Sequence, residues 1–89
     1  MNVHAAFRHV PPPISRSRRE VLRNEYLAFA SLALTQRRLS WVARHRAVEA
    51  ETEAKLDDYR HFAKEARRLW REAIYHLGAA QDRKAELNG

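Results

Sequence analysis

The chain has 89 residues, of which 45% are hydrophobic and 31% charged, and it contains no cysteine. This composition is typical of one small helix-rich domain, and it excludes disulfides, thiol chemistry and cysteine-ligated zinc. The formal net charge of +6 favours acidic partners such as nucleic acid or an acidic protein surface.

Residues 1–16 are predicted to form an extended arm. Pro11, Pro12 and Pro13 fix φ and remove three amide donors, which favours a stiff polyproline stretch. Residues 1–19 carry arginines and no acid, as organelle transit segments do, although the prolines interrupt the pattern. We expect an intracellular protein, and a mitochondrial location is a hypothesis that stays open.

A long helical region is predicted over residues 17–80. Ser17 and Glu20 form a capping-box pattern, and no proline or glycine follows until Gly78. Gly78 suits a helix C-terminus, so we expect the ordered helix to end between Leu77 and Ala85 and residues 81–89 to form a frayed tail. The longest apolar run, Tyr26–Leu34, is too short to span a bilayer.

The first half of this region is apolar on two sides. Leu27, Leu34, Trp41 and Val48 repeat every seven residues on one side, which Leu32, Leu39 and Val42 widen, and Leu22, Tyr26, Phe29 and Ala33 lie on the far side. One neighbouring helix covers only one side, so a further partner is implied. The predicted apolar partner-binding residues are Leu22, Tyr26, Phe29, Leu32 and Leu39.

The charge order near the middle favours a turn. The cations at 44–46 suit a helix C-terminus and the anions at 49, 51 and 53 suit an N-terminus, which places the turn near Ala47–Ala50. The predicted fold class is all-α: an extended Pro-rich N-terminal arm followed by a long antiparallel helical hairpin. One continuous helix of roughly 60 residues is the alternative, because no turn-forming residue is present and Glu51 and Lys55 are spaced as a helix pair.

The second half predicts a heptad seam, in which steps of three and four alternate. The predicted seam residues are Leu56, Tyr59, Ala63, Ala66, Trp70, Ala73, Leu77 and Ala80. Phe62, Leu69 and Ile74 broaden this seam.

Basic residues are concentrated in the first half and along one stripe of the second. Residues 1–48 carry nine arginines against Glu20 and Glu25, a net +7, and residues 49–89 carry a net −1. One basic strip of the first half contains Arg37 and Arg44, and the stripe of the second half runs from Arg60 to Arg71. Each strip suits contact with a phosphate backbone or an acidic protein, or else is a solvated flank of the helix. Trp41 is interpreted as a core residue rather than as a stacking surface. The predicted nucleic-acid or acidic-partner contacts are Arg16, Arg18, Arg19, Arg37, Arg44, Arg60, Lys64, Arg67 and Arg71.

Signals for chemistry are weak. Asp57, His61 and Glu65 are spaced by four, as are Glu72 and His76, but metal sites in bundles need ligands that converge from several helices. No glycine-rich loop or nucleophile elbow is present. We therefore expect no enzyme activity, catalytic residue, metal, cofactor or small-molecule substrate.

The predicted function is that of a non-catalytic helical accessory subunit of a larger assembly, whose basic N-terminal half contacts RNA or an acidic protein surface. A ribosomal or respiratory-complex subunit and a small phage inhibitor of a host machine both fit this description. The alternative is a self-assembling coiled coil or four-helix-bundle homodimer that binds nucleic acid directly.

Overall fold

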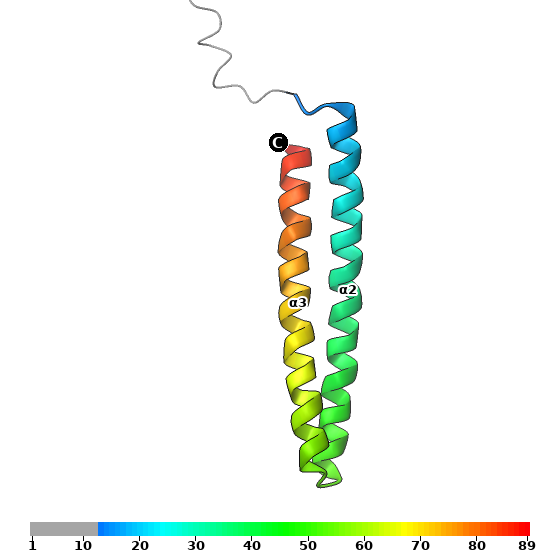
Figure 1. Cartoon of the computed structure of the whole chain (residues 1–89), viewed down its shortest axis with the longest axis vertical. Helices are drawn as coiled ribbons and strands as arrows, with labels where there is room; N and C mark the ends of the chain where they lie inside the picture. Colours follow the sequence, from blue (N-terminus) through cyan, green and yellow to red (C-terminus); the bar gives the residue numbers. More distant parts are fainter. Residues whose placement is uncertain (1–12) are drawn as a thin grey trace, which may run out of the picture.

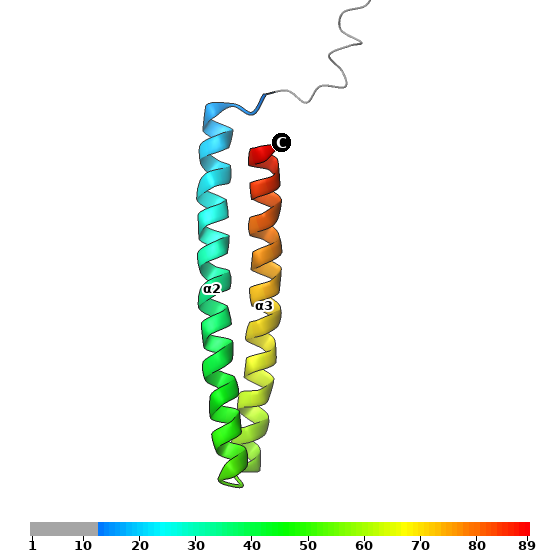
Figure 2. The same ribbon diagram turned by 180° about the vertical axis from the view of Figure 1, so that it is seen from behind.

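The computed structural model describes residues 13–89, which form two helices, α2 (Arg16–Thr52) and α3 (Leu56–Asn88). The helices lie side by side and antiparallel, and the start of α2 and the end of α3 meet at the same end of the molecule (Figures 1 and 2). This confirms the helical hairpin over the single continuous helix. The predicted arm falls almost entirely on residues 1–12, which lie outside the described residues.

Helix α2 begins two residues earlier than predicted. Ser15 is the N-cap, with φ −62° and ψ 155°, and its Oγ accepts a hydrogen bond of 3.1 Å from the Arg18 amide. The predicted cap at Ser17 is therefore wrong, because capping from Ser15 lets the helix form additional backbone hydrogen bonds. Glu20 lies 3.7 Å from the guanidinium of Arg16.

The turn lies at residues 53–55 and not at Ala47–Ala50 as predicted. The Ala54 amide donates to the Glu51 carbonyl (3.1 Å), and the Lys55 amide donates to the Ala50 carbonyl (2.9 Å). These two bonds form a Schellman motif, with Ala54 at the left-handed position (φ 59°) where glycine is usual. Ala47 and Ala50 are buried within α2, and this burial against α3 extends the helix past the predicted turn.

The face of α2 that packs on α3 contains Leu22 and then mostly small residues. Leu22 is fully buried, and the Phe29 ring stacks on His76 of α3 with centroids 5.9 Å apart. The buried positions continue at alternating steps of three and four, as in an antiparallel coiled coil. They are Ala33, Gln36, Ser40, Ala43, Ala47 and Ala50.

The packing face of α3 differs from the predicted seam at alternate positions. Ala66, Ala73 and Ala80 are buried as expected, but Leu69 is buried in place of Trp70. Trp70 and Leu77 are 44% and 49% exposed, so their placement in the seam is wrong. The facing alanines of α2 bring the two backbones close together, which leaves no space between them for an indole ring.

Helix α3 ends at Asn88, past the range Leu77–Ala85 that was predicted for its end. Gly78 lies inside it, and residues 81–88 are helical rather than a frayed tail. Arg83 donates to Glu25 at 2.9 Å, and Arg18 lies 3.2 Å from Glu86, so the last turns are held against the start of α2. Within residues 13–89, neither helix combines the length and apolarity that crossing a membrane requires.

Candidate functional site

The large apolar side chains lie beside the seam and not in it. On α2, Leu34, Trp41 and Val48 each follow a small seam residue by one position and repeat every seven residues. On α3, Trp70 and Leu77 are also seven residues apart, and the smaller Ala63 lies seven residues before Trp70. The two rows line two adjoining cavities on the same side of the hairpin.

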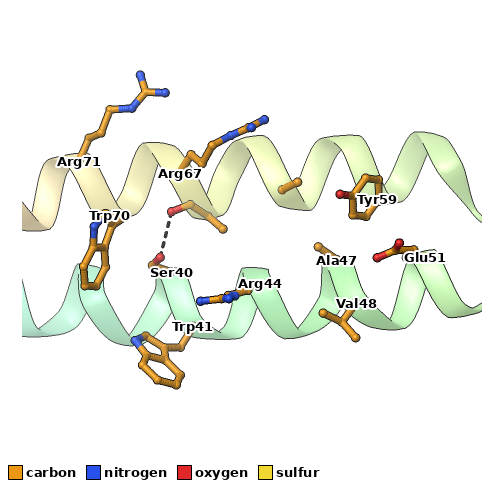
Figure 3. Close-up of a pocket in the computed structure, with 12 residues that line it drawn as sticks. Ser40, Trp41, Arg44, Ala47, Val48, Glu51, Tyr59, Arg67, Trp70 and Arg71 are labelled. Carbon is orange, nitrogen blue, oxygen red and sulfur yellow. Dashed lines mark hydrogen bonds between the residues drawn. The ribbon is translucent and has the colours of Figure 1, made fainter.

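The first cavity, here called the tryptophan groove, lies toward the turn and has a volume of about 510 Å³. Trp70 extends from α3 toward α2, and Trp41 extends outward from α2 (Figure 3). Between the helices, Ser40 Oγ donates to the Ala66 carbonyl at 2.9 Å. The lining residues are Ser40, Trp41, Arg44, Ala47, Val48, Glu51, Tyr59, Ala63, Ala66, Arg67, Trp70 and Arg71.

The second cavity, here called the aliphatic groove, lies further from the turn and has a volume of about 290 Å³. Trp70 lines both cavities, so the two grooves form one continuous surface along the hairpin. The other lining residues are Ala30, Ala33, Leu34, Arg37, Ala73, Ile74 and Leu77.

Both tryptophans of the chain line this surface. Trp41 is 62% exposed, so its interpretation as a core residue is wrong. At this level the seam of α2 consists of Ser40 and Ala43, whose small side chains let α3 pack close to α2. Trp41 therefore lies beside the seam and not within it. The exposure of two indoles and the neighbouring aliphatic side chains is typical of a surface that binds another macromolecule.

The charges that line the grooves are almost all positive. Four arginines line the two cavities, against Glu51 as the one acidic lining residue, and none of these arginines is in an ion pair within the described hairpin. They are Arg37, Arg44, Arg67 and Arg71. Arg67 and Arg71 extend from α3 away from α2, along the edge of the groove (Figure 3).

Two acids of α3, Glu65 and Glu72, take part in a polar network outside the grooves. Arg68 donates to both Glu65 and Glu72, and Glu72 also accepts a 3.0 Å hydrogen bond from Gln36 Nε2. His76 Nδ1 lies 2.7 Å from Gln36 Oε1, which assigns the ring proton to Nδ1 because the amide oxygen only accepts. This polar network crosses from α2 to α3 and fixes how the two helices align.

Two pKa values in this network are shifted by the ion pairs. Hydrogen bonds from Arg68 lower the pKa of Glu65, and the bonds to Glu65 and Glu72 raise the pKa of Arg68. The Glu65 carboxylate is therefore held in its charged form, which suits a structural role rather than proton transfer.

The predicted apolar partner-binding residues separate into two groups. Leu22 is buried and Phe29 packs on His76, and Tyr26, between them on the same helix face, is half-buried. Leu32 and Leu39 are exposed, but neither lines the grooves.

The predicted basic contacts also separate. Arg37, Arg44, Arg67 and Arg71 line the grooves, whereas Arg60 and Lys64 are exposed on α3 outside them. The remaining three, Arg16, Arg18 and Arg19, are exposed at the start of α2.

Sequence reasoning assigned Trp70 and Leu77 to the seam and gave Leu34 and Val48 no role in binding. A signal was present for Leu34 and Val48, because each directly follows an alanine of the α2 seam. Trp70 and Leu77 follow Leu69 and His76, so the same signal was absent for them.

The spaced carboxylates and histidines do not converge. Glu65 is bonded to Arg68, and His61 packs edge-on against Phe62. No three histidine, aspartate or glutamate side chains gather into a metal-binding group in the part of the chain that the structure describes.

Comparison with known proteins identifies no relative: no family model, curated protein or solved structure matches this chain.

Proposed function

We propose that this protein is a non-catalytic helical subunit of a larger assembly, and that it docks onto a helix of another protein through the tryptophan and aliphatic grooves. One observation carries the proposal: the hairpin packs alanines inside and leaves its tryptophans and most of its large aliphatic side chains outside. A groove between two helices is a common seat for a third helix, whose apolar side chains fill it.

The size and continuity of the groove support a protein partner. Leu34, Ile74 and Leu77 extend the apolar surface well beyond the two tryptophans. Burying such side chains contributes roughly 1.5–3 kcal/mol each, which compensates for the cost of ordering two chains. An aliphatic surface of this kind gives nucleic-acid bases nothing on which to stack.

Site-specific photo-crosslinking in the cells that make the protein tests this proposal. A photoreactive phenylalanine analogue replaces Val48 or Ile74, which line the two grooves, or replaces Arg38 or His45 as matched controls. Both control residues are exposed and line neither groove.

The expected result is the same protein adduct from both groove positions, with no such adduct from either control position. Trp70→Asp in the crosslinking protein should abolish the adduct. Adducts only to a second copy of the chain would support the homodimer instead, and adducts from all four positions alike would contradict the proposed docking surface.

A further inference from the structure

The partner's chemistry follows from the charges around the groove. Arg37 and Arg44 follow one helix of the hairpin, and Arg67 and Arg71 follow the other, so positive charge accompanies both of its walls. Arginine stays charged at an interface and binds carboxylates through two parallel hydrogen bonds.

Some arginines outside the groove are held by acids of the same chain, whereas others, such as Arg38 and Arg60, have no ion pair within residues 13–89. Arg18, Arg68 and Arg83 each pair with a glutamate of the same chain. Within residues 13–89 the groove arginines have no such acid, although Glu65 and Glu72 lie on the same helix as two of them. The arginines beside the apolar groove are therefore available to pair with acids of another molecule.

We propose that the groove binds an amphipathic helix of another protein that carries aspartate or glutamate along both edges of its apolar face. This inference rests on the proposed function and names the partner's chemistry. The apolar face fills the grooves around Trp70, and the acids pair with the arginines of the two walls.

A second copy of the chain fits this surface poorly. The same groove would bring its own arginines against those of the first copy, and among the described residues Glu51 is the one acid that lines it. Like charges brought together at an interface oppose association.

Single-stranded RNA matches the arginines but not the groove floor. The two tryptophans offer stacking surfaces, but they come from different helices, and Ile74, Leu77 and Leu34 continue the surface with aliphatic groups. The combination of apolar floor and basic edges matches an acidic amphipathic helix on both counts.

The length of the bound helix follows from the groove. The lining residues run from Ala30 to Glu51 on α2 and from Tyr59 to Leu77 on α3. At ~1.5 Å per residue the groove is about 30 Å long, so a helix of roughly 20 residues fills it.

Two designed peptides test the proposal against the full chain. Both are tryptophan-free amphipathic helices of about 20 residues with the same leucine face, one flanked by glutamate and the other by lysine. Binding is read from the fluorescence of Trp41 and Trp70, the two tryptophans of the chain, both of which line the groove. A poly-uridine oligonucleotide is the third probe.

The glutamate-flanked peptide should shift the tryptophan emission to the blue and bind at least tenfold more tightly than the lysine-flanked one. That preference should shrink as salt rises, because the added contacts are ionic. The double variant Arg44→Glu, Arg67→Glu should reverse the preference, and the control Arg38→Glu, outside the groove, should leave it unchanged. Circular dichroism establishes that each variant keeps its helices.

Equal binding of the two peptides would overturn the acidic-partner inference and leave the docking proposal standing. Tighter binding of the oligonucleotide, or a homodimer that neither peptide displaces, would also overturn it. Absence of binding by both peptides counts against the inference as well, whereas the docking proposal is judged separately by the crosslinks from Val48 and Ile74.

Discussion

Ala54 adopts the backbone conformation that ends α2, with φ of 59°. An L-residue with a Cβ atom is strained there by roughly 1–2 kcal/mol, because the Cβ approaches the neighbouring carbonyl oxygen. The strain persists because the two Schellman hydrogen bonds and the packing of α2 on α3 determine where the chain reverses. The tightest part of the hairpin is thus built without a glycine.

Replacing Ala54 with glycine should raise the free energy of unfolding by about 1 kcal/mol, because glycine adopts this φ without strain. Urea unfolding followed by circular dichroism measures the change. The same substitution at exposed Ala28, inside α2, should lower stability by roughly 0.5–1 kcal/mol. A loss of stability in Ala54→Gly would contradict the left-handed geometry.

Gly78 presents the opposite case, a glycine in a helix interior. A Cβ atom built at this position meets nothing within 4 Å, and its φ is not positive. Gly78→Ala should therefore stabilise the protein by roughly 1 kcal/mol through helix propensity, measured by the same urea unfolding. No gain, or a loss, would show that α3 does not continue through residue 78 as described.

Glu65 links the charge network to pH. Its pKa lies below the ordinary value of 4.5 because Arg68 donates hydrogen bonds to its carboxylate. A carboxylate with a lowered pKa stabilises the fold above its unfolded-state pKa, and this contribution is lost as the pH falls through the folded-state value.

Arg68→Met should return the pKa of Glu65 toward 4.5. Because the ion pair no longer contributes, the free energy of unfolding of this variant should fall less steeply below about pH 4.5 than that of the unmodified protein. Titration of the Glu65 side-chain carboxyl carbon by NMR measures the pKa directly. Arg38→Met is the control, since Arg38 contacts neither acid of the network. An unchanged Glu65 pKa in Arg68→Met would exclude the pair in solution.

At the scale of the helices, the seam between α2 and α3 is made of small residues. The Ser40 hydroxyl reaches the backbone carbonyl of Ala66 on the facing helix, which requires the two backbones to lie close together. Ala43, Ala66 and Leu69 form the buried cluster next to this contact. Each buried alanine removes little apolar area from water, so the stability of the hairpin depends on close packing along the whole length of the two helices.

Ala43→Leu should lower the free energy of unfolding by about 1–3 kcal/mol, because the larger side chain forces the helices apart. Ala28→Leu is the matched control, since Ala28 is exposed and the change should stay within about 0.5 kcal/mol. Chemical unfolding of the two variants makes the comparison. An unchanged free energy of unfolding in Ala43→Leu would contradict the close packing of the two helices at this position.

At the scale of the whole molecule, the small apolar side chains are buried and most of the large ones are exposed. The described hairpin fully buries a single large side chain, Leu22, and leaves a continuous apolar surface along one side. A monomer with such a surface binds a partner or associates with itself. The grooves are therefore a consequence of the close helix pairing as much as of the residues that line them.

Two leucines give opposite expectations that test this arrangement. Leu22→Gln should destabilise the hairpin by roughly 2–4 kcal/mol, because it places an amide in a fully buried site. Leu77→Gln should change stability by less than about 0.5 kcal/mol and should reduce binding of an apolar dye such as anilinonaphthalene sulfonate. The reverse pattern would show that the predicted seam through Leu77 was right after all.

Part of the candidate site was accessible from sequence. Four of the predicted basic contacts line the grooves, because helical spacing placed Arg37 and Arg44 on one strip and Arg67 and Arg71 on another. The apolar part was not accessible from sequence. Trp70 and Leu77 have the spacing of a heptad seam, and so do Leu69 and His76, which face α2 in the structure.

Sequence alone determined the helical character of this protein, because helix propensity and the absence of proline act locally. The charge order favoured two helices over one, but the tertiary structure decided between them and moved the turn to residues 53–55. Which of the two apolar sides of α2 faces inward was decided only by the tertiary structure. That choice depends on how closely two helices approach, and the approach depends on the alanines of both helices together. Leu22 and Phe29 consequently pack inside, and Leu34, Trp41 and Trp70 are left exposed.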